Sequence, residues 1–426
     1  MIESFLIKQR YKKLIDKNTR EVIDFCTEIA NKNNINIYLV GGLVRDLLLD
    51  VNVFDVDILI EYDAIKFAKL IIENSIKATI IKINDGLKTV RLKMNDIEFD
   101  IASTRSESYP KAGHLPIIDS YACSIQEDLA RRDFSINSLA ISLNKDRYFH
   151  TIDIFNGISD LKSGELKILH ENSFKDDPTR ILRAFKFRLR FNNLSLDPHT
   201  FSLQENYLNN ITDYDICSSR LKSELIEIFN MNNMKSFSIF INEQIYKLFF
   251  DTFDYKYSSN IFQKLNNIPE IIEKYLAKTK DKNNLWLIYF ALLLKPDYSN
   301  LKLNLSFTKN EKRILEQAFF LILNKKKFSF EDNFDKDFSI YTFFQAKYIE
   351  AILIYYFITD DKNALYYLDN LYNIKIQTTG KTLIELGLKP GKDFQYIFQN
   401  LLRLKISNPS LTSEEEIIYI KNNYKL

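Results

Sequence analysis

The sequence predicts an α+β protein in which a small head, with a mixed β-sheet and helices, precedes an elongated all-α neck, body and tail. Six of the nine glycines lie at or before Gly164, and none falls between residues 165 and 379. That long span is dense in Leu, Ile, Phe and Tyr at helical spacing, which is typical of stacked helices. We expect a head at 1–146, a neck at 147–229, a helical body at 230–325 and a helical tail at 326–426.

Composition excludes several classes of protein. With 46% apolar residues in 426, the chain can fill more than one hydrophobic core. The longest apolar runs, 285–294 and 351–358, are about half as long as a membrane crossing requires, so no membrane partner is expected. Charges inside the N-terminal apolar stretch do not fit a secretory signal. Cys26, Cys123 and Cys217 are far apart, a pattern that favours reduced cytoplasmic thiols over a zinc site.

The net charge of +2 gives no general attraction to nucleic acid. Any binding to RNA must therefore depend on basic residues that gather on one surface. The sequence carries no signal for an oligomeric state.

The stretch from 38 to 60, YLVGGLVRDLLLDVNVFDVDILI, predicts a strand, a Gly-Gly turn, a helix at 43–49 and a strand at 54–60. Because strand side chains alternate, Asp55 and Asp57 should share one face. Neighbouring carboxylates repel each other unless a cation lies between them, as in two-metal phosphoryl transfer. Gly41 and Gly42 let backbone N–H groups approach a triphosphate. Each feature alone is usually a turn or a solvated strand edge, but together they indicate metal-dependent nucleotidyl transfer.

GGLVRDLLL followed by DVD resembles the signature of the tRNA nucleotidyltransferase and bacterial poly(A) polymerase family, which belongs to the polymerase-β-like nucleotidyltransferases. The resemblance implies a polymerase-β-like head in which Asp55 and Asp57 hold Mg²⁺ and carry catalysis. It also implies nucleotide contacts from Gly41, Gly42 and Arg45.

The rest of the head alternates helices and strands. Helices are predicted within 1–34 and at 63–74, and strands at 79–83, 88–94 and 97–102. In the last strand Glu98 and Asp100 share a face, so Asp100 is a candidate third catalytic carboxylate. The alternative is an acid that faces solvent. The resemblance supports the catalytic interpretation, because the family completes its metal site from a neighbouring strand.

Residues 103–123 contain Pro110, Gly113 and Pro116 without a regular period, and we expect a loop there. It resembles the flexible loop that the family needs when it changes from adding C to adding A. Arg105 and Glu107 lie on it.

A capping box at Ser124 and Glu127 predicts a helix that leads into RRDFSINSLA. The Arg-Arg-Asp run by itself is more often a surface charge cluster. The stretch resembles the family's RRDFTINALA, from which two serines depart. The resemblance implies that Arg132, Asp133 and Asn137 contact the ribose and phosphates, with a preference for ribonucleotides through the 2′-OH.

A helix is predicted from about 178 to 191, with Arg180, Arg183 and Lys186 spaced three residues apart. For an isolated helix, a solvated basic face is the simpler interpretation. DDPTR resembles the family's EDxxR, which implies that Asp177 and Arg180 read the nucleobase. Arg183 and Lys186 then face the triphosphate, although the family usually has Arg in place of Lys186.

The chemistry of that pair fits two bases out of four. A carboxylate only accepts hydrogen bonds and a guanidinium only donates them. Cytosine and adenine both present an amino donor beside a ring-nitrogen acceptor, and guanine and uracil reverse this order. An Asp beside an Arg therefore accepts CTP and ATP, because a wrong base leaves buried polar groups unpaired.

Two later segments extend the resemblance. SSRLKSELIEIF resembles the family's RIxxEL, in which Arg220 and Glu224 either stabilise the neck or form an ordinary surface pair at i and i+4. TTGKTLIELGLKPG resembles GxDLIxLGxxPG, with Thr382 where Asp is common. The family packs this tail region against the tRNA elbow.

As a whole, the resemblance implies a CCA-adding enzyme that transfers CMP and AMP from CTP and ATP to the tRNA 3′ end. CC-only addition, A-only addition and poly(A) synthesis are alternatives within the family. Poly(A) polymerases usually carry a strongly basic tail, which the acidic residues Glu414 to Glu416 do not fit. A non-catalytic RNA-binding protein is the alternative outside the family, and the intact carboxylates and Gly-Gly pair argue against it.

Overall fold

The structure is a computed structural model that describes residues 2–52, 55–211, 218–231, 235–250, 267–276, 284–294, 305–325 and 335–424. It forms two compact units. The first comprises Met1–Glu224 and Ile239–Leu248, and the second comprises Leu225–Ser238 and Phe249–Leu426. The four-part division expected from the sequence stays a prediction. Cys217 lies outside the described residues.

The first unit is built around a seven-stranded sheet with strand order β3-β4-β5-β2-β1-β8-β9. The strands are β1 (Ile37–Val40), β2 (Asp57–Ile60), β3 (Ala78–Asn84), β4 (Thr89–Met94), β5 (Ile97–Ser103), β8 (Leu139–Ser142) and β9 (Thr151–Asp153). The β2–β5 pair is parallel, and the other neighbours are antiparallel. The sheet is therefore mixed, as the sequence predicts.

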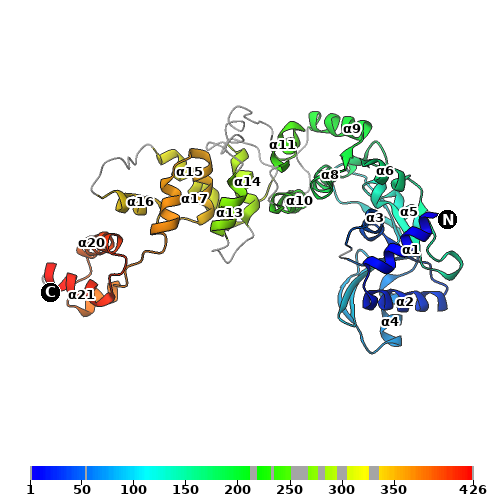
Figure 1. Ribbon diagram of the computed structural model, residues 1–426, viewed down its shortest axis with the longest axis horizontal. Coiled ribbons are helices and arrows are strands. Elements are labelled where there is room, and N and C mark those ends of the chain that lie inside the picture. The colour runs from blue at the N-terminus through cyan, green and yellow to red at the C-terminus, as the bar shows by residue number, and fades with distance from the viewer. Residues whose placement is uncertain are drawn as a thin grey trace. The chain divides into compact units, whose positions relative to one another are not determined.

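Helices cover one face of this sheet (Figure 1). They are α1 (Ile2–Leu14), α2 (Lys17–Lys32) and α4 (Ala64–Asn74). A further helix, α3 (Gly42–Leu49), follows the Gly-Gly turn. Ile58, Leu92 and Ile101 point to the covered face and are at most 1% exposed. Because strand side chains alternate, Asp57 and Arg91 lie on the opposite face, and both are exposed.

Residues 103–123 are not a single loop, contrary to the sequence prediction. β6 (Arg105–Ser108) and β7 (Ile117–Tyr121) pair as an antiparallel hairpin. Its cross-strand contacts are polar, for example 2.8 Å between Ser108 Oγ and Asp119 Oδ1. The hairpin buries little apolar surface, so the hydrophobic alternation that normally indicates strands is missing.

The remaining elements of the first unit follow the capping box at Ser124 and Glu127, which is present as predicted. They are α5 (Ile125–Ala130), η1 (Ser135–Asn137), η2 (Lys145–Arg147), α6 (Gly157–Ser163), β10 (Glu165–Leu166), α7 (Ser173–Asp176), α8 (Thr179–Arg190), β11 (Ser195–Leu196), α9 (Pro198–Asn209) and η3 (Ile245–Leu248). In α8, Leu182 and Phe185 are fully buried and form its apolar side.

The described part of the second unit contains helices and no strands, as predicted. Two helices, α10 (Ser218–Asn230) and α11 (Lys235–Asn242), are shared between the units. The others are α13 (Ile268–Leu276), α14 (Leu285–Leu293), α15 (Lys309–Asn324), α16 (Lys336–Phe344), α17 (Ile349–Thr359), α18 (Asn363–Tyr366), η8 (Tyr367–Leu371), α19 (Gly380–Glu385), α20 (Lys392–Ser407) and α21 (Ser413–Asn423).

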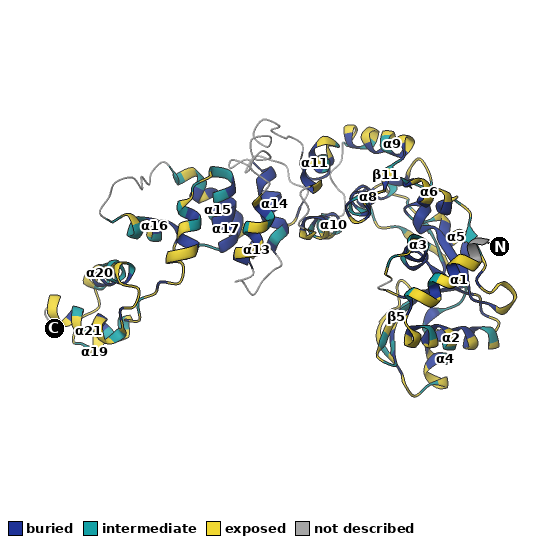
Figure 2. Cartoon of the chain, in the orientation of Figure 1, coloured by how far each residue is buried: buried dark blue, intermediate teal, exposed yellow. Residues whose placement is uncertain are grey.

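The core of this second unit is formed by helices that are buried nearly all round. α14 and α17 are mostly buried along their lengths (Figure 2). In the C-terminal part, Leu383, Ile397, Leu401 and Ile420 form a separate small cluster with no exposed surface. Across the described helices of the whole chain, none combines the length and the apolar composition of a membrane span.

Candidate active site

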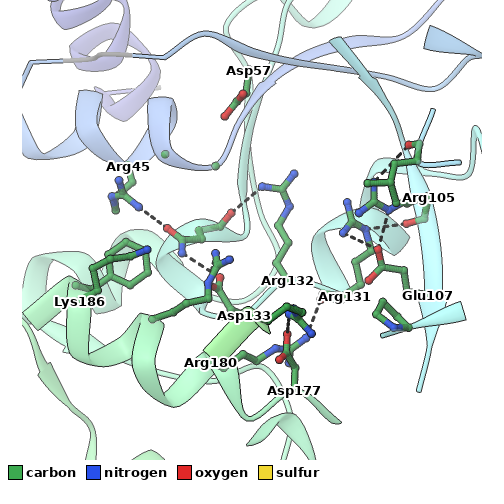
Figure 3. Close-up of a pocket in the computed structure, with 18 of the residues that line it drawn as sticks. Arg45, Asp57, Arg105, Glu107, Arg131, Arg132, Asp133, Asp177, Arg180 and Lys186 are labelled. Carbon is green, nitrogen blue, oxygen red and sulfur yellow. Dashed lines mark hydrogen bonds and ion pairs between the residues drawn. The ribbon is translucent and has the colours of Figure 1, made fainter. Parts of the chain in front are cut away.

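A cavity of about 920 Å³ lies in the first unit (Figure 3). Its walls come from the Gly-Gly turn, the start of β2, the β6–β7 hairpin, the end of α5, and helices α8 and α10. Every predicted site residue except Asp100 lines it: Gly41, Gly42, Arg45, Asp55, Asp57, Arg132, Asp133, Asn137, Asp177, Arg180, Arg183 and Lys186. Residues spread over 146 positions of the sequence therefore meet in one place.

The Gly-Gly turn joins β1 to α3, and its two glycines differ in how far they need to be glycine. Gly41 has φ +62° and ψ −124°, a conformation that other residues rarely adopt. A Cβ atom there would lie 2.9 Å from Arg132 Nη1. At Gly42 a Cβ atom would lie an ordinary 3.5 Å from Arg45 Nη2. The turn thus brings bare backbone up to the Arg132 guanidinium.

Two carboxylates form another part of the cavity wall. Strand β2 begins at Asp57, and Asp55 precedes it. The prediction that Asp55 belongs to the strand is therefore wrong, and Phe54, the predicted first residue, lies outside the described residues. Loss of solvation raises the pKa of Asp57, and the charges of Asp100 and Asp55 raise it further. Among the described residues, no lysine or arginine forms an ion pair with Asp55 or Asp57.

This donor set fits a divalent cation. Mg²⁺ is usually held by one or two carboxylates while water and substrate phosphates complete its octahedral shell. Asp55 and Asp57 supply two carboxylates that have no basic partner and repel each other without a cation. Within the described residues, no group of three acidic, His or Cys side chains is close enough to hold a metal ion by itself. Water and phosphate oxygens would therefore complete the coordination.

Asp100 lies beside these acids but does not line the cavity. It is the Cα partner of Asp57 on the neighbouring parallel strand. Its carboxylate accepts two hydrogen bonds from Arg91, with Nε to Oδ1 at 2.9 Å and Nη2 to Oδ2 at 2.6 Å. The structure thus confirms that Asp100 neighbours Asp57, and its role as a third catalytic carboxylate stays a prediction.

A chain of hydrogen bonds connects α3 to α8 through the buried segment at η1. Arg45 Nη1 donates to Asn137 Oδ1 at 2.7 Å, and Asn137 Nδ2 donates to Asp133 at 3.0 Å. Asp133 also accepts from Arg183 Nε at 2.8 Å. Burial alone would raise the pKa of Asp133, but Arg183 and the donors of Asn137 and Phe134 together lower it. Asp133 is therefore a buried anion that orients both of its neighbours.

Three of the four basic side chains on the cavity face of α8 pair with an acid from a different element, and the exception is Arg180. The N···O distances are 2.7 Å for Arg183–Asp133, 2.7 Å for Lys186–Glu224 and 3.1 Å for Arg190–Asp46. The helix face is therefore not a solvated basic surface, which was the simpler interpretation of the sequence. It presents three cations whose partners come from the η1 segment, α10 and α3.

The two expected base-reading residues lie at the start of α8. Asp177 accepts from the Thr179 hydroxyl at 2.6 Å and from Arg220 Nη2 at 2.5 Å. Arg180 donates to Ser173 Oγ at 2.5 Å and to the Arg131 carbonyl at 3.1 Å. Both side chains line the cavity and are held in place by neighbours.

Arg220 and Glu224 do not form the i, i+4 surface pair that the sequence allowed. Arg220 bonds to Asp177, and Glu224 bonds to Lys186. These partners lie on α8 and just before it, so α10 is attached to the site residues by two ion pairs. The sequence did suggest a stabilising role, and the structure shows which residues Arg220 and Glu224 contact.

The sequence analysis missed several cavity residues, among them Tyr109, Arg131 and Arg190. Arg190 continues the α8 series one turn beyond Lys186, so the helical spacing could have identified it. Arg131 joins Asp128 and Glu107 with N···O distances of 2.7 and 3.1 Å, as Figure 3 shows for Glu107. Tyr109 lies in the hairpin connection, where no pattern in the sequence indicates its contact with Arg180.

The first unit, with its cavity, is similar to a head domain of known proteins. Residues 37–167 match the family model described as the Poly A polymerase head domain. The A-adding tRNA nucleotidyltransferase of Halalkalibacterium halodurans is 42% identical over 165 residues, which are 39% of this chain and 38% of that protein.

Two further relatives match over most of the chain. The A-adding tRNA nucleotidyltransferase of Geobacter sulfurreducens is 28% identical over 405 residues, 92% of this chain and 45% of that protein. The CCA-adding enzyme of Lactobacillus helveticus is 25% identical over 392 residues, 89% of this chain and 91% of that protein. The chain spans less than half the length of the two A-adding relatives.

Solved structures show the same fold. A CCA-adding enzyme in its apo form II has a TM-score of 0.82 at 24% identity, covering 98% of this chain and 99% of that one. The Thermotoga maritima CCA-adding enzyme complexed with tRNA has a TM-score of 0.73 at 24% identity, covering 98% of both chains. A CCA-adding enzyme complexed with ATP has a TM-score of 0.80 at 24% identity and 97% coverage of both.

Residues 37–167 thus match the Poly A polymerase head domain, and most of the chain is similar to A-adding tRNA nucleotidyltransferases and to CCA-adding enzymes.

Proposed function

We propose that this protein is a template-independent tRNA nucleotidyltransferase that builds the 3′-CCA end from CTP and ATP. One observation carries the proposal: a single cavity is lined by the Asp55 and Asp57 carboxylates and by the Asp177 and Arg180 side chains. The first pair suits phosphoryl transfer, and the second suits a base with an amino donor beside an acceptor. The match to a CCA-adding enzyme along 89% of the chain supports it.

We propose Mg²⁺ as the ion that Asp55 and Asp57 hold, with Asp100 contributing from the next strand. The ion would lower the pKa of the tRNA 3′-hydroxyl and stabilise charge on the departing pyrophosphate. In the reaction, the 3′-oxygen forms a bond to the α-phosphorus while the bond from that phosphorus to the bridging α–β oxygen breaks. No covalent enzyme intermediate is needed.

The chain's own side chains would bind and orient the nucleotide. The backbone N–H groups that follow Gly41 at the start of α3 would face the triphosphate. Arg132, Arg183 and Lys186 would donate to its oxygens. Asp133 and Asn137, held by Arg45, would contact the ribose. Each of these assignments is supported by a place in the cavity wall.

Base selection would follow from the direction of two hydrogen bonds. Asp177 would accept from the amino group of cytosine or adenine, and Arg180 would donate to the adjacent ring nitrogen. Guanine and uracil would set an acceptor against Asp177 and a donor against Arg180. The site would therefore reject them, because either base would leave buried polar groups without partners.

The test uses two RNAs and labelled nucleotides. Purified protein is incubated with tRNA that ends at the discriminator base, and with tRNA that already ends in CC. Each is supplied with CTP, ATP or both. CCA addition predicts three added nucleotides on the first RNA with both nucleotides, and one AMP on the second with ATP alone. Absence of incorporation into either RNA would refute the proposal.

A-only addition is the second candidate, because two relatives carry that name, at 42% identity over 165 residues and 40% identity over 158 residues. It predicts AMP on the CC-ended RNA and no CMP on the other. CC-only addition predicts CMP alone, and poly(A) synthesis predicts long AMP tails. The same six reactions therefore separate all of these activities.

We further propose tRNA as the RNA partner, with the tail from Gly380 onward in contact with its elbow, and the cytoplasm as the place of action. The solved complex of a CCA-adding enzyme with tRNA supports the partner. The free thiols of Cys26 and Cys123 support the compartment.

A further inference from the structure

Four side chains form a row across the uncovered face of the sheet. Asp57 on β2, Asp100 on β5, Arg91 on β4 and Lys82 on β3 are successive Cα partners. Side chains paired in this way lie on the same face of a sheet. The row therefore changes from acidic to basic with distance from the proposed metal site.

This row leads away from the nucleotide cavity. Asp57 lines the cavity, whereas Asp100, Arg91 and Lys82 do not. In phosphoryl transfer the attacking oxygen and the leaving group lie roughly in line on opposite sides of the phosphorus. If the triphosphate occupies the cavity, as the proposed function requires, the RNA 3′-hydroxyl must approach the acids from outside it. The face that carries Asp100, Arg91 and Lys82 borders Asp57 without lining the cavity, so it offers such an approach.

Arg91 has donors to spare on this face. A guanidinium carries five N–H donors. Nε and Nη2 each donate to Asp100, whereas Nη1 donates to no described residue, and the side chain is 50% exposed. Lys82 is also exposed and forms no ion pair with any described residue. Both cations are available to an anionic partner, and Arg91 can bind it without releasing Asp100.

We propose that Arg91, together with Lys82, binds the phosphate backbone of the RNA strand whose 3′-hydroxyl is extended. Arg91 holds Asp100 beside Asp57 through two of its nitrogens and contacts an RNA phosphate through the third. It is a positioning residue for the RNA end and reads no base. This inference rests on the proposed function and names the surface that delivers the second substrate.

The first test measures RNA binding without nucleotide or metal, so that catalysis is not needed. The probe is a fluorescent acceptor-stem minihelix without an elbow, titrated by anisotropy between about 50 and 200 mM KCl. Arg91→Ala is expected to weaken binding about tenfold and to reduce the log–log salt slope by about one, as the loss of one phosphate contact does. Lys82→Ala should cause a smaller loss, and Arg91→Lys should keep part of the affinity.

Lys93→Ala is the matched control, since Lys93 lies on the same strand and face but is paired with Asp96 at 3.0 Å. It should bind like the wild type. The double variant Arg91→Ala/Asp100→Asn tests whether the loss only reflects an uncovered Asp100 charge. We expect the double variant to bind as weakly as Arg91→Ala. Recovery of wild-type binding in the double variant would overturn the inference.

Steady-state kinetics supply the second readout. Arg91→Ala is expected to raise KM for the RNA about tenfold while KM for CTP and ATP stays unchanged. Wild-type RNA binding and salt slope in Arg91→Ala, or a raised KM for the nucleotide in place of the RNA, would refute the role. The proposed function fails separately, if the wild type binds RNA through Arg91 but transfers no nucleotide.

Discussion

The Arg220 guanidinium donates a hydrogen bond of 2.5 Å to Asp177, 43 residues earlier in the chain. The same Nη2 lies 3.2 Å from Thr179 Oγ1, so one nitrogen contacts two residues at the start of α8. Arg220 also lines the cavity. The orientation of the carboxylate that we propose accepts from the base is thus set by the first turn of α10.

We predict that Arg220→Met relaxes the choice of base. Without its partner, the Asp177 carboxylate can rotate, and the penalty for a wrong base should fall by about 1–3 kcal/mol, which is tenfold to hundredfold in relative kcat/KM. The measurement is kcat/KM for CTP, ATP, UTP and GTP. Ser223→Ala, on the same helix, serves as the control because its hydroxyl bonds only within the helix. An unchanged CTP to UTP ratio in Arg220→Met would contradict the prediction.

We predict that Asp55→Asn and Asp57→Asn each reduce transfer by about 10³-fold or more, the scale of removing a group that stabilises transition-state charge. The Tm should behave differently. The pKa of Asp57 is raised by desolvation and by Asp100 and Asp55, so the native state disfavours its charge. Asp57→Asn should therefore keep or raise the Tm in the absence of metal. A lower Tm would show that the carboxylate stabilises the fold.

Gly41 and Gly42 offer a matched pair for a test of backbone strain. Gly41→Ala should destabilise the protein by about 1–3 kcal/mol, because Ala is strained at φ +62° and its Cβ would push against Arg132. Gly42→Ala should leave the free energy of unfolding nearly unchanged or slightly higher. Gly42 is the first residue of α3, where Ala is a better helix former, and the added Cβ would lie at an ordinary contact distance from Arg45. Urea unfolding of both variants provides the comparison. Equal stabilities would argue against strain at the turn.

Arg183→Met should destabilise the protein by about 1–3 kcal/mol at pH 7, because it leaves Asp133 buried with one cation fewer. This is less than for a fully buried pair, since the Arg183 side chain is 43% exposed. In the wild type the pKa of Asp133 is lowered, so the pair stabilises the fold above the ordinary pKa near 3.8 and loses that contribution in stronger acid.

The pH dependence gives this prediction a sharp control. In Arg183→Met, burial should raise the pKa of Asp133, so this carboxylate becomes protonated at a higher pH than in the wild type. Protonation removes the buried charge and with it the loss of stability. The difference in unfolding free energy between the two proteins should therefore shrink as the pH falls from 7 toward 4. Urea titrations at several pH values measure it. A difference that stays constant over this range would mean that Arg183 acts through packing and not through its charge.

Local patterns in the sequence predicted much of the first unit. The strand predicted at 88–94 is present as β4, and the capping box at Ser124 correctly predicted the start of α5. The helix predicted from about 178 to 191 is present as α8. Each of these features depends on neighbours within a few residues, which is the range over which sequence patterns carry information.

Local sequence patterns did not predict the tertiary partners of the charged residues. The i, i+4 rule pairs Arg220 with Glu224, but the fold offers Asp177 and Lys186 as closer partners. The β6–β7 hairpin was predicted as a loop because its pairing is polar. The pairing of Arg91 with Asp100 was not predicted, because it depends on the register between β4 and β5.

The ion pairs on α8 also set what the cavity can attract. Arg183, Lys186 and Arg190 each face a carboxylate of the protein, so these three positive charges are compensated. A simple anion such as inorganic phosphate would have to compete with three fixed acids for its contacts. A ligand that is long enough to contact several of these cations at once would form more contacts than the ion pairs it replaces. The site therefore favours a long, multiply charged anion over a small one.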